Sequence, residues 1–199
     1  MDFDDLIAKL TAPPNRVGKH EGDHEHHLYE GAVMVAYAMH LFQALPTHEV
    51  RIYPDGMHGA QFDFTGWLGR RGFGKVSALG STLWGGIYSD KAGHTIIINP
   101  KSGQGDIVAE SAGVRVVAEC KGGVTNTSHA GQISRLERGL SEAVGQLMSK
   151  ENGGRQIAVV PMTRRTSALA RRMARRCAAA GIEIALVSER GEVTYVVGD

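Results

Sequence analysis

The spacing of apolar and polar residues along the chain predicts an α/β protein, because helical and strand-like periods alternate. The first half is expected to contain a short amphipathic helix ended by two prolines, a buried helix, a hairpin around Asp55-Gly56 and a glycine-rich loop, at residues 1–12, 25–44, 50–64 and 65–93. The buried helix has apolar side chains on most faces. The glycine-rich segment shows weak periodicity, which is typical of a functional loop or clamp.

The second half of the chain has a sharper pattern. Strands are expected at residues 95–99, 106–110, 114–120, 156–160, 183–187 and 193–197, and amphipathic helices at residues 132–150 and 167–180. Alternating strands and helices of this length favour one α/β domain over residues 1–199, with a central mixed β-sheet flanked by helices. Within it we expect an N-terminal arm at residues 1–20 and the main core at residues 94–199.

Composition agrees with one globular domain, since the chain has 199 residues, 42% apolar and 22% charged. Its formal net charge of +1 hides an uneven distribution, because acids gather in the first thirty residues and arginines at residues 164–176. Four of these arginines repeat at helical i, i+4 spacing, namely Arg171, Arg172, Arg175 and Arg176. Such a stripe suits phosphate contacts, although a solvated helix face or a dimer surface explains it as well.

Two features place the expected protein in a reducing cytoplasm. Its two cysteines, Cys120 and Cys177, make neither a disulfide framework nor a zinc site by themselves. The acidic N-terminus is unlike a secretory signal, and the longest apolar run, residues 31–42, is too short to span a bilayer. We therefore expect no membrane partner.

The residues that carry chemistry lie between Gly105 and Gly123. If Ala112-Gly113 forms a tight two-residue turn, cross-strand pairing places Asp106 opposite Glu119, so both side chains project from one face of the hairpin. Lys121, two residues further, leans from the same face.

Paired carboxylates repel each other, and a cation relieves that repulsion. Oxygen-only ligation favours Mg²⁺ or Mn²⁺ over zinc, and a neighbouring lysine can orient or deprotonate a water. Hydrolysis of a phosphodiester bond needs such a set of groups.

An aspartate, twelve intervening residues and then Glu-Cys-Lys at the end of an apolar strand resembles the PD-(D/E)xK nuclease superfamily, which includes restriction endonucleases, Holliday-junction resolvases and RecB-like exonucleases. The resemblance covers the element order of residues 25–190 (helix, three strands, helix, strand) but is specific only at Asp106, Glu119 and Lys121. It implies a restriction-endonuclease-like core and Mg²⁺-dependent cleavage of DNA in repair, restriction or anti-phage defence. A homodimer or a larger defence or repair complex is the expected assembly, apart from this resemblance.

The same resemblance assigns roles to residues. It implies that Asp106, Glu119 and the backbone carbonyl of Cys120 bind the metal and that Lys121 positions the attacking water. A further acid on the first core helix is matched by Glu30, and the glutamine of RecB-like members is matched by Gln146, with Gln132 as the alternative. One departure is that Gly105 stands where the motif has proline.

Other interpretations remain open at this point. The three motif residues can form a solvated strand end, and Glu110 with Arg115 is expected to form a cross-strand salt bridge. His24, His26, His27 and Glu30 suggest zinc, but no further ligand motif completes a tetrahedral set. Residues 94–105 resemble the phosphate loop of diacylglycerol-kinase-type lipid kinases, but that family needs a following helix. A catalytically inactive nucleic-acid-binding or assembly module is the main alternative function.

Overall fold

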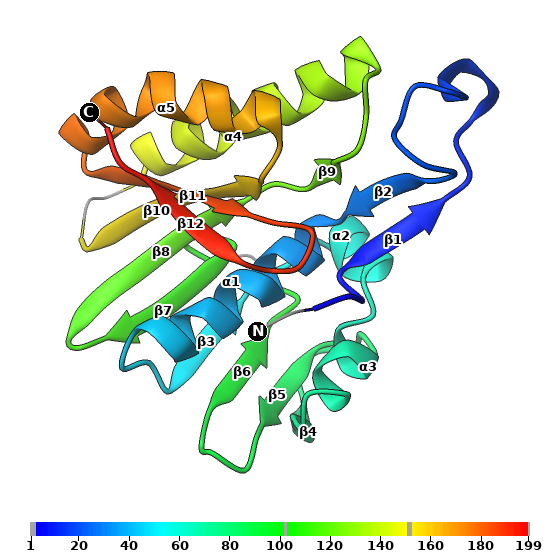
Figure 1. Cartoon of the computed structure of the whole chain (residues 1–199). Coiled ribbons are helices and arrows are strands. Elements are labelled where there is room, and N and C mark those ends of the chain that lie inside the picture. Colours follow the sequence, from blue (N-terminus) through cyan, green and yellow to red (C-terminus); the bar gives the residue numbers. More distant parts are fainter. Residues whose placement is uncertain (1–2, 102, 151–152, 199) are drawn as a thin grey trace.

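A mixed β-sheet of nine strands runs through the described part of the chain (Figure 1). The structure is a computed structural model that describes residues 3–101, 103–150 and 153–198. In spatial order the strands are β12 (Val193–Val196), β11 (Ile182–Val187), β10 (Arg155–Pro161), β8 (Val114–Cys120), β7 (Ile107–Ser111), β3 (Glu49–Ile52), β6 (Thr95–Ile98), β5 (Gly86–Ser89) and β4 (Gly74–Ala78). Parallel pairs occur at β10–β11, β10–β8 and β3–β6.

Helices cover the two faces of this sheet, as Figure 1 shows. Helix α1 (Glu30–Ala44) packs on one face, and α4 (Ala130–Met148) with α5 (Arg164–Ala179) packs on the other. The alternation along β10 separates the two sides, because Ile157 belongs to the core around α1 and Ala158 to the core under α4 and α5. The expected α/β architecture with a mixed sheet flanked by helices is therefore confirmed, and the chain forms one domain.

The second half of the chain follows its sequence pattern closely. Helices α4 and α5 and strands β6, β8, β10, β11 and β12 lie where periodicity places them, within two or three residues. The stripe on α4 that includes Leu136, Leu140 and Leu147 is buried against the sheet. The hairpin of β7 and β8 has the predicted register, with Ser111 opposite Val114.

The first half corrects several expectations. Residues 1–12 do not form a helix, because Ile7–Leu10 is strand β1, which pairs with β2 (Glu25–Leu28), and β2 pairs with β9 (Gly123–Val124). The N-terminal arm therefore belongs to a small three-stranded sheet, with a 3-10 helix, η1, at Pro14–Arg16. The expected helix of residues 25–44 loses its first residues to β2, because their backbone pairs on both sides.

The expected hairpin of residues 50–64 is also wrong beyond β3. After β3 the chain forms helices α2 (Gly56–Gln61) and α3 (Phe64–Gly69). Asp63 caps α3 by accepting a hydrogen bond from Gly66 N at 2.9 Å, and Phe64, Trp67 and Leu68 bury one helical face. The glycine-rich segment of residues 65–93 is not a loop, because it contains most of α3 and the antiparallel pair β4 and β5, which extends the sheet.

Candidate active site

The turn between β7 and β8 sets the geometry of the candidate site. Ala112 and Gly113 have φ values of 51° and 75°, as a two-residue turn of the primed type requires. The last paired residues at the open end are Ile107 and Ala118, so Asp106 and Glu119 follow at the same end of the hairpin. Since Ala118 and Cys120 are buried in the core around α1, Glu119 lies on the opposite face of the sheet.

Four of the residues proposed from the sequence come together there. Lys121 Nζ lies 3.8 Å from Glu30 Oε2 and 3.9 Å from Asp106 Oδ2. The same Asp106 oxygen accepts a hydrogen bond from the Cys120 backbone N–H at 2.7 Å. Glu30 reaches the site from the first turn of α1, where the helix dipole favours a negative charge. Two acids from separate segments of the chain thus lie beside one lysine.

A second lysine, which the sequence did not single out, completes the cluster. Lys150 follows the C-terminal end of α4 and donates a hydrogen bond from Nζ to Glu119 Oε1. The Glu119 side chain is only 5% exposed, so the contact is made to a buried carboxylate. The only sequence signal was position, because Lys150 is the final residue of the expected helix.

The electrostatics of the site reflect crowded negative charge. Burial and the neighbouring Glu119 carboxylate raise the pKa of Asp106 from 3.8 to about 7, although the Cys120 N–H and Lys121 oppose this. Burial lowers the pKa of Lys121, but Glu30, Asp106 and Glu119 outweigh it and leave that pKa above its ordinary value. Lys121 is therefore an ammonium group at neutral pH.

These residues line a cavity of about 340 Å³. Its wall includes all three acids and both lysines, and Gln146 contributes from α4. Gln132 instead lines a separate cavity of about 550 Å³ that shares Glu30 and Lys121 with the first. Of the two glutamines considered, Gln146 is the one that lines the cavity with the acids.

Gly105 packs closely against β8. A Cβ atom at this position would lie 2.7 Å from Val117 Cγ1 and 3.0 Å from the Ala118 carbonyl oxygen. A side chain at position 105 would therefore require Val117 or the hairpin backbone to shift.

The donor set consists of oxygen atoms, which fits Mg²⁺ or Mn²⁺ by ligand type. Among the described residues, however, no three His, Cys, Asp or Glu side chains form a group that could hold a metal ion. The reason is visible in the contacts, because Lys121 lies between Glu30 and Asp106 while Lys150 contacts Glu119. The acids are arranged around ammonium groups.

The histidine cluster has other partners than a metal. His26 Nδ1 lies 3.1 Å from Glu189 Oε2, and His27 Nε2 lies 3.1 Å from Glu25 Oε2. His24 is exposed, and its backbone carbonyl accepts a hydrogen bond from Asn126. The His26 contact connects β2 to the turn between β11 and β12, whereas the His27 contact lies within β2.

The four arginines of the stripe are exposed on α5. Leu169 and Met173 on the same helix pack toward the core under α4 and α5. The stripe is thus an outward-facing basic surface.

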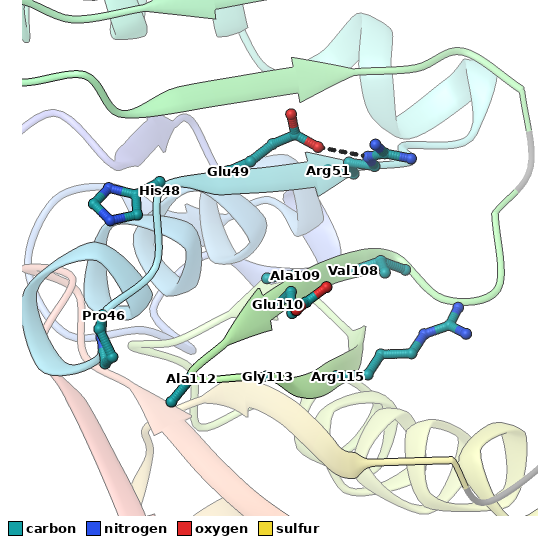
Figure 2. Close-up of a pocket in the computed structure, with 10 residues that line it drawn as sticks. All are labelled: Pro46, His48, Glu49, Arg51, Val108, Ala109, Glu110, Ala112, Gly113 and Arg115. Atoms are coloured by element: carbon teal, nitrogen blue, oxygen red, sulfur yellow. Dashed lines mark hydrogen bonds and ion pairs between the residues drawn. The ribbon is translucent and has the colours of Figure 1, made fainter.

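Glu110 and Arg115 lie directly opposite each other but form no salt bridge, which corrects the sequence expectation. Figure 2 shows them at the edge of a different cavity, of about 660 Å³, where Arg51 pairs with Glu49 at 2.8 Å. Both side chains are exposed, so water replaces the ion pair at little cost.

The loop that resembles a kinase phosphate loop is followed by strand β7, whereas that family needs a helix. Pro100 and Gly103 of this loop line the candidate site.

Comparisons with models of protein families, with curated proteins and with solved structures found no match. In the described part of the chain, no helix combines the length and apolar character needed to cross a membrane.

Proposed function

We propose that this chain is a metal-dependent nuclease that hydrolyses DNA phosphodiester bonds. The observation that carries the proposal is the convergence of Glu30, Asp106 and Glu119 with Lys121 around one cavity of about 340 Å³. Several acids and two lysines in one cavity, with the pKa of the Asp106 carboxyl strongly raised, are typical of a catalytic centre rather than of a solvated strand end.

In this proposal Asp106, Glu119 and the Cys120 backbone carbonyl hold Mg²⁺ or Mn²⁺, with Glu30 as a further ligand. The bound ion would supply an activated water and neutralise charge on the phosphate. Lys121, protonated at neutral pH, donates hydrogen bonds that orient the water and stabilise the phosphorane-like charge. Its role is accordingly positioning and charge stabilisation rather than removal of a proton.

The topology supports the same function. If α2, α3, β4, β5, β6 and β9 are taken as insertions, the elements α1, β3, β7, β8, α4 and β10 follow the order helix, three strands, helix, strand that the resemblance to PD-(D/E)xK nucleases implies. Within it β3, β7 and β8 are antiparallel neighbours, and β8 runs parallel to β10. A restriction-endonuclease-like core is part of this proposal.

The surroundings of the cluster suit a polyanion. The neighbouring cavity of about 550 Å³ carries Arg16 and Arg135 and opens from the same Glu30 and Lys121. A strand of DNA lying across both cavities would place one phosphate at Lys121 and the phosphates of the adjoining nucleotides beside these arginines. The outward arginine stripe of α5, with Gln146 in the cavity, would add further contacts. We place the activity in cytoplasmic DNA repair, restriction or anti-phage defence, in a homodimer or a larger complex.

A second candidate is a nucleic-acid-binding or assembly module without cleavage. The contact between Lys150 and Glu119 favours it, because a lysine at the central acid replaces a metal in neutralising its charge. The test is nicking of supercoiled plasmid by purified protein with Mg²⁺, with Mn²⁺ and with EDTA. The nuclease is supported by nicking that needs the metal and is lost in Glu119→Gln. Retarded migration of plasmid without nicking in either metal supports the binding module instead.

A further inference from the structure

Lys150 holds the buried carboxylate of Glu119 in a way that no other described cation does. Its Nζ donates to Glu119 Oε1, whereas Lys121 is engaged between Glu30 and Asp106. Glu119 is only 4% exposed as a residue, and it belongs to β8, an interior strand of the sheet. A buried carboxylate without a counter-charge is costly, so this lysine stabilises the metal-free fold.

The same carboxylate is a metal ligand in the proposed nuclease, and the ammonium group and a divalent cation would compete for it. We propose that Lys150 is the resident counter-ion of the centre, which a divalent cation must displace from Glu119 before the site is complete. This inference rests on the proposed function and adds a positioning residue to it. Lys150 acts through Glu119 and is not assigned contact with the reacting atoms.

The structure also provides a place for the displaced side chain. Lys150 lines the site cavity and, in addition, a neighbouring cavity of about 240 Å³ whose wall includes Gln104 and Arg115. Its side chain is 28% exposed and has a flexible four-carbon stem. Rotation of this stem alone can therefore move Nζ from Glu119 toward water, without moving the end of α4.

No three His, Cys, Asp or Glu side chains of the described residues form a group that could hold a metal ion, so a divalent cation at this site requires the acids to move. Glu30 and Asp106 lie beside Lys121 and Glu119 contacts Lys150, and these contacts hold the carboxylates around lysines instead of around one common point. Removing Lys150 should free Glu119 for the ion. Metal binding should therefore be tighter without this lysine.

The test is calorimetric titration of Mn²⁺ into wild type, Lys150→Gln, Lys150→Arg and Lys101→Gln. We expect the Mn²⁺ Kd of Lys150→Gln to fall about five- to tenfold, which is the effect of losing one partly buried competing ion pair. Lys150→Arg keeps the pair and should bind Mn²⁺ like wild type. Lys101 is an exposed neighbour on the loop that lines the cavity, so Lys101→Gln controls for charge at a distance and should leave Kd unchanged.

A thermal-unfolding cycle in EDTA keeps the test independent of metal uptake. Lys150→Gln should lower Tm when Glu119 is present but not when it is combined with Glu119→Gln, because the neutral glutamine at position 119 needs no counter-ion. Equal Mn²⁺ Kd values for wild type and Lys150→Gln would overturn the role of Lys150 and leave the nuclease standing. No Mn²⁺ uptake by wild type or by Lys150→Gln would overturn the metal site itself. Uptake by Lys150→Gln alone would support displacement in its strongest form.

Discussion

Replacing Asp106 with asparagine should stabilise the metal-free protein at alkaline pH and abolish cleavage. The folded carboxyl has a pKa of about 7 because it is buried beside Glu119, whereas its ordinary value is 3.8. A raised carboxyl pKa means that the folded state holds a proton that the unfolded chain releases. Stability therefore falls as pH rises from about 4 to about 7, and asparagine, which carries no charge, escapes this loss.

The size of the effect follows from the shift. About 3 pKa units correspond to roughly 4 kcal/mol at most, at 1.36 kcal/mol per unit. Because the neighbouring Glu119 carboxylate causes part of the rise in the Asp106 pKa, we expect a gain below that maximum, about 1–3 kcal/mol for Asp106→Asn near pH 8. Near pH 5 the folded carboxyl is already protonated, so the gain should be smaller by about half or more. The amide oxygen of asparagine can still accept the hydrogen bond from Cys120 N–H.

The assay is urea unfolding of wild type and Asp106→Asn in EDTA, near pH 5 and near pH 8. Asp23→Asn, at an exposed acid outside the site, is the matched control and should give the same small difference at both pH values. Excess Mg²⁺ near pH 8 should stabilise wild type, since the ion replaces the missing counter-charge, and should leave Asp106→Asn nearly unchanged. A variant that is less stable than wild type near pH 8, or a gain that does not depend on pH, would refute this account of the site.

Three further outcomes are expected. Glu119→Ala and Lys121→Ala should each lower the plasmid-nicking rate roughly 100-fold or more with little loss of DNA affinity, because each removes about 3 kcal/mol of transition-state stabilisation. Full residual cleavage in either variant would contradict the assignment of these residues to the catalytic site. Arg171→Gln combined with Arg175→Gln should weaken DNA binding without changing sequence preference, and should reduce the slope of log affinity against log salt by about 1–2. An unchanged slope together with a shift from dimer to monomer in sedimentation would instead assign the arginine stripe to assembly. Ala112→Gly should raise the free energy of unfolding by about 0.5–1 kcal/mol, since alanine is strained at its φ of 51°; lower stability in urea unfolding would contradict this.

The second half of the fold was predictable because its signals are local. The helix stripes of α4 and α5 repeat along one segment, and the register of β7 and β8 follows from a single turn at Ala112-Gly113. The first half depends on contacts that are distant in sequence. Strand β2 pairs with β1 along its whole length and also with β9, where His27 lies opposite Val124, almost a hundred residues away, and periodicity within one segment contains no trace of these pairings.

The candidate site divides in the same way. Hairpin arithmetic predicted that Asp106 and Glu119 lie at the same end of the hairpin, and strand alternation placed Lys121 near them; all three line one cavity, although the paired register ends at Ile107 and Ala118. The contact of Lys150 with Glu119 depends on where α4 ends above β8, which is set by packing of the whole helix on the sheet. The Glu110–Arg115 salt bridge failed for another reason, since opposite positions on an exposed sheet face do not require a bond.

The central claim is that Asp106 and Glu119 hold a divalent cation, and diffraction from crystals soaked in Mn²⁺ tests it most directly. We expect an anomalous difference peak within about 2.0–2.3 Å of both carboxylates and of the Cys120 carbonyl oxygen, with Lys150 Nζ moved away from Glu119. Crystals at saturating Mn²⁺ with no peak at this position, and with Lys150 still bound to Glu119, would contradict it.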